Sequence, residues 1–261
     1  MAPRWRLIVE TEPSDGAWSM ALDRAIQTSR ARGETPPTLR IYGWMRPTVT
    51  FGRFQDAASV DLDACRRYGV DVVRRFTGGR GVLHDDEVTY SVVAATADGV
   101  PRGTSASYRH LCTALVEAYG RLGLVDASLT HRPRGSSASV ACYLHATSAD
   151  LSVGIRKLSG SAQVWMGDTV LQHGSLTMTR DVAREAEVFG LTTAEKSALS
   201  ESTATLEDCL ADTPSREVVR AALAEGFSSA LEVDFDQGGP TASEIAIARG
   251  LLPDVTLGTI S

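Results

Sequence analysis

The sequence predicts an α+β fold in a single domain of 261 residues. Strand-like segments dominate its first two thirds, and helical periodicity dominates from about residue 180. Strands and helices do not alternate regularly, and no internal repeat is present, so a parallel βαβ architecture is not indicated. Neither a G-x-G-x-x-G sequence nor a Walker sequence occurs, so standard dinucleotide and P-loop nucleotide sites are not indicated either.

Composition and charge narrow the class of protein. A hydrophobic content of 43% and a charged content of 22% are ordinary for a soluble globular chain. The formal net charge of −6 argues against a general nucleic-acid binder, whose domains are usually basic. Apolar runs are too short for a membrane span, and the N-terminus lacks the pattern of a signal peptide. We therefore expect a cytoplasmic protein.

The N-terminal elements are read from their periodicity. From Asp15 onward, Trp18, Leu22, Ala25 and Ile26 recur at helical spacing. The following segment, residues 28–40, is rich in polar residues, glycine and proline, and we expect a loop that ends where the next strand begins. Strands are predicted at residues 4–10, 39–44, 48–52, 71–76 and 87–93.

The later elements follow a loop predicted at 101–107. A continuous apolar stripe predicts a helix over 106–122, and Cys112 belongs to that stripe, so we expect it in the core. Residues 150–165 and 169–178 read as paired strands joined by a turn at 166–168. Two further helices are predicted, one capped by Thr213 with Pro214 and reaching 231, the other capped by Thr241 with Glu244 and ended by Gly250.

A glycine- and arginine-rich stretch, RRFTGGRGVLHD (residues 74–85), separates two of these strands. Gly78, Gly79 and Gly81 permit positive φ and remove the side chains that keep a ligand away from the backbone. Exposed N–H groups in such a loop can bind an anion or a carbonyl oxygen, and Arg74 or Arg75 can add charged hydrogen bonds to a phosphate. The alternative is a wide hairpin that carries a solvated arginine cluster.

The four cysteines, Cys65, Cys112, Cys142 and Cys209, show no C-x-x-C spacing, so neither zinc nor a disulfide is expected. Cys142 follows the polar segment GSSASVA and is a candidate nucleophile. A cation from Lys157 or His145 would lower its pKa. From local sequence alone, a buried inert cysteine and a surface lysine remain the alternatives.

Three further features could take part in chemistry or binding. The run HDDE (residues 84–87) could bind a hard metal, but adjacent acids in a strand point to opposite faces, and no metal is expected. His173 is either a site residue or a strand histidine with satisfied hydrogen bonds. The basic run at 131–135 is either a solvated loop or a surface for an acidic partner.

Four segments, taken together, resemble the lipoate–protein ligase and octanoyltransferase family, which is related to the biotin–protein ligases. The resemblance implies the α+β catalytic domain of that family, a mixed β-sheet packed with helices, over residues 1–261. The segments occur in the family's order within roughly residues 5–250 and are SMALDRAI (19–26), LRIYGWMRPTVTFGRFQ (39–55), RRFTGGRGVLHDDEVTYSVV (74–93), and GIRKLSGSAQ (154–163) followed by LQHGSLTM (171–178).

The resemblance also implies roles for single residues. Lys157 matches the family's lysine that hydrogen-bonds the acyl carbonyl, and Arg74 and Arg75 would face a phosphate-bearing donor. The residues implied to line the acyl tunnel or to approach the ligand closely are Thr77, Gly78, Gly79, Arg80, Gly81, His84, Gly160, Ser161, Ala162 and His173.

Cys142 lies fifteen residues before Lys157, the position of the cysteine in the cysteine-dependent octanoyltransferase branch. That branch implies a monomer that moves an octanoyl group from acyl carrier protein to a lysine of a lipoyl domain or of glycine cleavage H protein. Neither ATP nor a metal is required. Val164 and Trp165 depart from the family's pattern, which commonly has a basic residue there.

Three alternatives remain open at this point. An ATP-dependent lipoate–protein ligase would need ATP and Mg and no cysteine nucleophile. A non-catalytic homologue would bind an acyl group or a carrier protein. An amidotransferase would move octanoyl between two protein lysines by the same cysteine chemistry.

Overall fold

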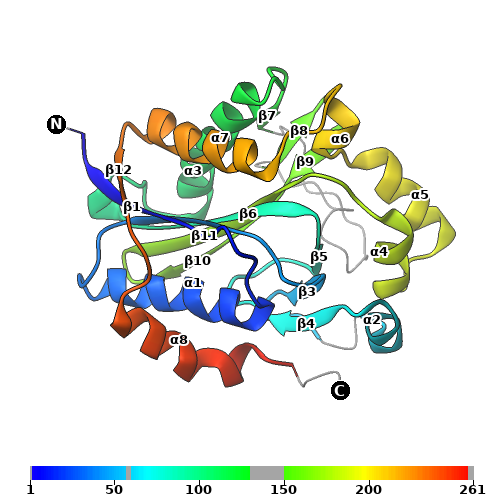
Figure 1. Cartoon of the computed structure of the whole chain (residues 1–261), viewed down its shortest axis with the longest axis horizontal. Helices are drawn as coiled ribbons and strands as arrows, with labels where there is room; N and C mark the ends of the chain where they lie inside the picture. The colour runs from blue at the N-terminus through cyan, green and yellow to red at the C-terminus, as the bar shows by residue number, and fades with distance from the viewer. Residues whose placement is uncertain (1, 57–59, 130–149, 258–261) are drawn as a thin grey trace.

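The structure is a computed structural model and describes residues 2–56, 60–129 and 150–257. A six-stranded sheet crosses the molecule, with helices on both of its faces (Figure 1). Helices α3 and α7 cover one face, and helices α1 and α8 cover the other. None of the described helices is long and apolar enough to cross a membrane.

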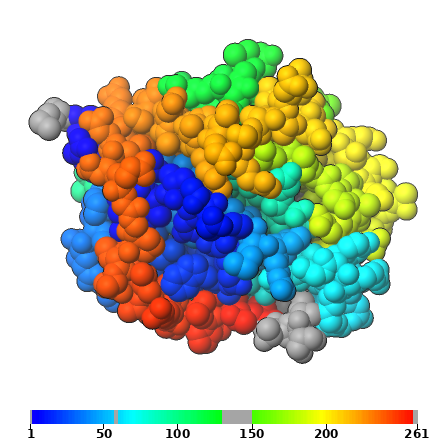
Figure 2. Space-filling model, viewed as in Figure 1, coloured from blue at the N-terminus to red at the C-terminus, as the bar shows by residue number. Residues whose placement is uncertain are grey.

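The central sheet has the strand order β10-β11-β6-β2-β1-β12. Strand β1 is parallel to both β2 and β12, and the other neighbouring pairs are antiparallel, which confirms the expected mixed sheet. Figure 2 shows the orange segment between α7 and α8 lying along the blue N-terminal strand, where β12 pairs with β1. The bounds of the strands are β1 Arg4–Val9, β2 Thr38–Tyr42, β6 Glu87–Ala95, β10 Ser161–Met166, β11 Thr169–Thr177 and β12 Asp234–Gln237.

Two small three-stranded sheets flank the central one. Their orders are β4-β3-β5 and β7-β8-β9. The first carries the glycine-rich loop between β4 and β5. The second carries Lys157 on β9. The bounds are β3 Thr48–Phe51, β4 Asp71–Arg74, β5 Val82–His84, β7 Ser128–Leu129, β8 Leu151–Val153 and β9 Arg156–Ser159.

Helices cover both faces of the sheet, so strands β2, β6 and β11 are buried on both faces, with polar as well as apolar side chains. One core cluster lies under α3 and α7 around Trp5, Leu111 and Phe227. A second lies under α1 and α8 around Leu22 and Ile26. The helix bounds are α1 Gly16–Ala31, α2 Leu62–Tyr68, α3 Thr104–Arg121, α4 Val182–Val188, α5 Thr193–Ser202, α6 Leu206–Cys209, α7 Arg216–Leu231 and α8 Ala242–Val255, with a 3₁₀ turn at Thr96–Asp98.

Several predicted element ends were wrong. Helix α1 continues to Ala31, four residues into the segment expected to be loop, and α3 begins at Thr104 inside another such segment. Ser215, not Thr213, caps α7 by accepting a hydrogen bond from the amide of Val218. Gly250 does not end α8, because the helix continues to Val255. Packing against α1 outweighs the intrinsic cost of a glycine within the helix.

Strand β12 was missed altogether. Its four residues, Asp234–Gln237, include only one apolar side chain and give no strand pattern. The strand exists because it pairs in parallel with β1 and forms the edge of the sheet, a contact between residues more than 200 positions apart.

A buried ion pair fastens α8 to the sheet. Arg6 on β1 donates from Nη1 to Glu244 Oε2 at 2.9 Å and from Nη2 to Oε1 at 2.5 Å. Glu244 is fully buried, and its carboxylate also accepts from the amide of Thr241, the N-cap of α8. One carboxylate therefore both starts the helix and joins it to the sheet.

We predict that Glu244→Ala lowers the free energy of unfolding by about 3–5 kcal/mol, because it leaves Arg6 buried without its counter-charge. Urea denaturation monitored by circular dichroism measures this change. Asp236→Ala is the matched control, since it breaks the exposed Arg4–Asp236 pair and should change little. Equal losses in the two variants would contradict the role assigned to Glu244.

Candidate active site

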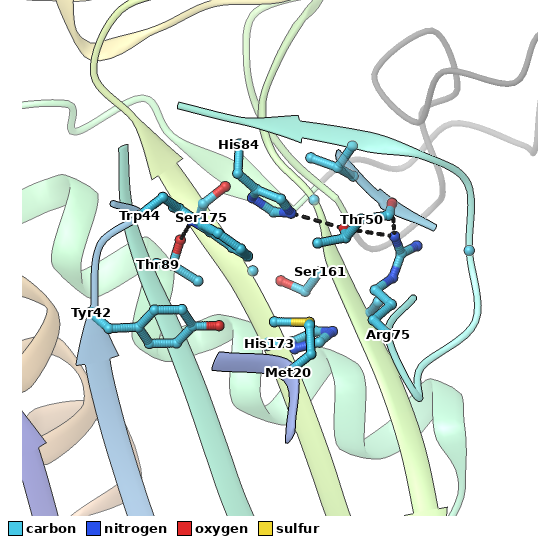
Figure 3. Close-up of a pocket in the computed structure, with 15 residues that line it drawn as sticks. Met20, Tyr42, Trp44, Thr50, Arg75, His84, Thr89, Ser161, His173 and Ser175 are labelled. Carbon is cyan, nitrogen blue, oxygen red and sulfur yellow. Dashed lines mark hydrogen bonds between the residues drawn. The ribbon is translucent and has the colours of Figure 1, made fainter. Parts of the chain in front are cut away.

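A pocket lies between the central sheet and the small β4-β3-β5 sheet (Figure 3). It brings together side chains from α1, β2, β3, β5, β6, β10 and β11. Its lining consists of Met20, Tyr42, Trp44, Thr50, Arg75, Gly79, Val82, His84, Thr89, Gly160, Ser161, Ala162, His173, Gly174 and Ser175.

Seven of the residues singled out from the sequence line this pocket together: Arg75, Gly79, His84, Gly160, Ser161, Ala162 and His173. Arg74, Thr77, Gly78, Arg80 and Gly81 are not part of its lining. Sequence reasoning missed Met20, Tyr42 and Trp44, whose apolar helix and strand patterns look like those of any core residue.

The glycine loop approaches β3 so closely that a second glycine is required opposite it. A Cβ added at Gly52 would lie 2.0 Å from the carbonyl oxygen of Gly79. Gly79 has a φ of 93°, in the left-handed region that favours glycine. Gly78 and Gly81 do not use the positive φ that glycine permits. The close approach therefore explains Gly52 and the positive φ explains Gly79, whereas a Cβ at Gly78 would have no neighbouring atom within 4 Å.

On the opposite wall of the pocket, the turn at the start of β10 lies close to β11. A Cβ at Gly174 would lie 2.5 Å from Ser161 Oγ and 2.7 Å from the carbonyl oxygen of Gly160. The turn that starts β10 therefore lies directly on β11 at Gly174. Tyr90 and Tyr108 hold this turn, because the Tyr90 hydroxyl lies 2.7 Å from Ser161 Oγ and the Ser161 amide donates to the Tyr108 hydroxyl at 2.9 Å.

Arg75 is buried and holds the glycine loop from inside. Its guanidinium donates to the carbonyl oxygens of Thr50, Gly78 and Arg80 at 2.7–2.8 Å. It also donates to the hydroxyls of Thr50 at 3.0 Å and Thr77 at 3.1 Å. The expectation that Arg75 hydrogen-bonds a phosphate was wrong, because these groups of the protein occupy its guanidinium, and only its charge can act on a neighbouring anion.

His84 belongs to a hydrogen-bonded unit on one side of the pocket. Its Nδ1 lies 2.7 Å from Glu87 Oε1, and its Nε2 lies 2.9 Å from Thr50 Oγ1. Because Thr50 Oγ1 already accepts from Arg75, its own proton is available to His84 Nε2. This arrangement favours the tautomer whose Nδ1–H donates to Glu87. The ring stacks on Trp44 with centroids 4.2 Å apart.

His173 repeats the same arrangement on the other side. Its Nε2 lies 2.8 Å from Thr77 Oγ1, and its Nδ1 lies 3.2 Å from Asp23 Oδ2. Burial lowers the pKa of His173, with the Asp23 carboxylate acting in the opposite direction, so the imidazole is neutral near pH 7. Burial raises the pKa of Asp23, but Arg40 and His173 more than offset it, and the net shift is downward.

These contacts form one continuous hydrogen-bonded chain: Glu87, His84, Thr50, Arg75, Thr77, His173, Asp23 and Arg40. The polar side-chain atoms of these eight residues are thus hydrogen-bonded to one another. Figure 3 shows the side chains of Met20, Tyr42 and Trp44 directed into the same space. The arrangement suits an apolar ligand whose polar end lies elsewhere.

Lys157 lies at the Gly160 edge of this pocket and is buried, contrary to the surface-lysine alternative. Its Nζ lies 3.0 Å from Asp150 Oδ2 and 3.0 Å from the position that a Cβ would occupy at Gly160. Asp150 also accepts from the Tyr108 hydroxyl at 3.2 Å. A positive charge is therefore held beside the turn that begins β10.

The three cysteines that the structure describes do not line the pocket. Burial raises the pKa of Cys112, which confirms its core position, raises that of Cys65 to about 11, and raises that of Cys209. None has the lowered pKa of a reactive thiol. Cys142, His145 and the basic run at 131–135 lie outside the described residues.

The acids of the HDDE run point in different directions. Asp85 pairs with Arg184 and Asp86 with Arg216, whereas Glu87 faces His84. Among the described residues, no group of three or more His, Cys, Asp or Glu side chains could hold a metal ion.

Residues 15–228 match the family described as the lipoyl protein ligase A/B catalytic domain. Octanoyltransferase LipM of Kyrpidia tusciae is 38% identical, covering 95% of this chain and 94% of the relative. Octanoyltransferase LipM of Moorella thermoacetica is 36% identical, with coverage of 93% and 92%.

Solved structures resemble the whole chain. A putative lipoate protein ligase from Thermoplasma acidophilum with bound lipoic acid superposes with a TM-score of 0.78 at 29% identity and covers 97% of this chain and 96% of that one. A lipoate-protein ligase A bound with ATP superposes with a TM-score of 0.79 at 29% identity, with coverage of 97% and 95%.

We predict that Thr77→Val raises the pKa of His173, because it removes the hydroxyl that donates to the neutral imidazole. NMR titration of labelled histidine should place the wild-type pKa below about 6.5 and the variant's pKa above the wild-type value. Thr113→Val, which changes an exposed hydroxyl on α3, is the control. A wild-type pKa at or above 6.5 would contradict the neutral assignment.

Proposed function

The chain belongs to the lipoyl protein ligase A/B catalytic-domain family, and from this premise we propose that it transfers octanoyl from a thioester donor to a protein lysine through a thioester on Cys142. The chain is an acyltransferase of the octanoyltransferase type, and proteins that accept lipoyl groups are its acceptors. We assign acyl carrier protein as the donor and a lipoyl domain or glycine cleavage H protein as the acceptor. The enzyme acts as a monomer and requires neither ATP nor a metal.

The observation that carries this proposal is the apolar pocket with Lys157 at its edge. Burial of a saturated chain in such a pocket contributes about 0.8 kcal/mol for each methylene group. The carbonyl at the end of that chain would lie beside the turn at Gly160, within reach of the Lys157 ammonium. The pocket thus separates the part that binds the tail from the part that meets the reacting carbonyl.

The reaction consists of two acyl-transfer steps. The Cys142 thiolate attacks the donor's carbonyl carbon, the bond from that carbon to the donor sulfur breaks, and the donor thiolate leaves and takes up a proton. The octanoyl group is then held as a thioester on Cys142. The neutral amine of the acceptor lysine attacks this thioester, forms an amide and loses a proton, and the Cys142 thiolate is released.

Lys157 stabilises the charge that develops on the carbonyl oxygen in both steps. Its ammonium is retained in a buried place by Asp150, which lies 3.0 Å away. Such a fixed donor acts on the transition state without needing to reorganise.

The ATP-dependent ligase remains a second candidate, because the fold also superposes on a lipoate-protein ligase bound with ATP. It differs in three measurable ways. It needs ATP, releases pyrophosphate in the presence of free lipoate, and does not need Cys142.

We predict that Cys142→Ala abolishes octanoyl transfer from acyl carrier protein to a lipoyl domain in the absence of ATP. The free energy of unfolding should be almost unchanged. Cys209→Ala is the matched control and should keep full activity, since Cys209 lies outside the pocket. A Cys142→Ala variant that stays active and releases pyrophosphate with ATP and lipoate would support the ligase instead.

We predict that Lys157→Met lowers the transfer rate by about 100–1000-fold, the usual loss when one oxyanion donor is removed. The single variant leaves Asp150 buried without its ammonium, so the double variant Lys157→Met, Asp150→Asn is measured beside it. The double variant removes both charges and so distinguishes a catalytic loss from a loss of folding. Near-normal turnover in a folded double variant would remove Lys157 from the mechanism.

A further inference from the structure

A second cavity, about 260 Å³ in volume, is lined mainly by arginines. Its lining residues are Arg24, Arg53, Arg74, Arg75, Phe76 and Asp254. Four guanidinium groups and one carboxylate give this lining a formal charge of about +3. The whole chain carries −6, so the cavity concentrates positive charge against the balance of the molecule.

Three of these cations have no ion-pair partner in the part of the chain that the structure describes. No carboxylate there lies within 4.0 Å of a nitrogen of Arg24, Arg53 or Arg74, Asp254 included. Arg74 donates only from Nη1, to the carbonyl oxygens of Gly52, Arg53 and Gln55 at 2.8–3.2 Å. The remaining N–H groups of its guanidinium are available to a ligand.

Without a bound anion, the positive charges of this cavity repel one another. Arg24 is half-buried, with one hydrogen bond to Gln27 at 2.7 Å and its guanidinium over the ring of Phe76 at 5.3 Å. Burial and then the charge of Arg53 lower the pKa of Arg24. Like charges that are held together in a partly desolvated place are typical of a site that binds the opposite charge.

The arginine cavity adjoins the apolar pocket. Met20 lines the pocket and Arg24 lines the cavity, and these residues are four positions apart on the same face of α1. Four residues of α-helix correspond to about 6 Å along the axis. Arg75 lines both spaces. A ligand that joins an acyl chain to an anionic group can therefore contact both.

We propose that the arginine cavity binds the phosphate of the donor's phosphopantetheine arm. This inference rests on the proposed function and names the part of the donor that the enzyme recognises apart from the acyl chain. Guanidinium groups bind phosphate through paired, charge-assisted hydrogen bonds.

The test compares octanoyl-phosphopantetheine with octanoyl-pantetheine as donors for wild type, Arg24→Gln and Arg53→Gln. With the phosphorylated donor, each variant should lose at least about tenfold in kcat/KM, mainly through KM, because one charged hydrogen bond is lost. With the unphosphorylated donor, the change should stay within about twofold, since that donor makes no such bond. Arg121→Gln, which changes an exposed arginine on α3 across the sheet, is the control and should match wild type with both donors.

A wild-type enzyme that uses the two donors equally, or variants that lose both donors equally, would overturn the phosphate site. If the wild type transfers from neither donor, octanoyl–acyl carrier protein is used in their place; no transfer from it means that the proposed function itself fails, and calorimetry then tests the cavity directly. Binding of phosphopantetheine to wild type that is lost in Arg24→Gln supports the site. Absence of binding, or tighter binding of ATP than of phosphopantetheine, overturns it.

Discussion

The hydrogen bonds from the buried guanidinium of Arg75 to five acceptors determine the shape of the pocket. They hold the glycine loop against β3, where Gly52 leaves room for the Gly79 carbonyl. The same bonds orient the hydroxyls of Thr50 and Thr77 toward the two histidines. Loop position and imidazole tautomer therefore depend on one side chain. A lysine could not replace it, because five acceptors in these directions require a planar guanidinium.

Three neighbouring regions around the loop held by Arg75 each suit a different chemical group. The apolar pocket suits a saturated chain, and Lys157 with Asp150 provides a charged group at the carbonyl end of that pocket. The arginine cavity beside it is suited to an anion. A thioester donor contains these three parts, whereas free lipoate lacks the phosphate. Differences in charge and polarity along the site thus correspond to the chemistry of an acylated carrier arm.

Local sequence singled out the glycine loop because its composition is itself unusual. Local sequence alone left Lys157 as a surface residue, and the roles expected of Lys157 and of the small residues at Gly160–Ala162 came from the resemblance to the family. The structure brings Lys157, Gly160–Ala162 and part of the glycine loop together. Trp44 and Gly174 gave no such signal, since an apolar residue or a glycine in a strand gains its meaning from a contact distant in sequence. Arg75 was misread because sequence does not show which way a side chain points, and helix ends were misread where packing outweighed propensity.

The central claim is that the octanoyl group passes through a thioester on the enzyme. Intact-protein mass spectrometry after incubation with octanoyl–acyl carrier protein, without ATP or acceptor, tests this claim most directly. The account predicts one octanoyl adduct on the wild type, which hydroxylamine removes and which peptide mapping assigns to Cys142. Absence of an adduct on an enzyme that still transfers octanoyl to its acceptor would contradict the thioester route.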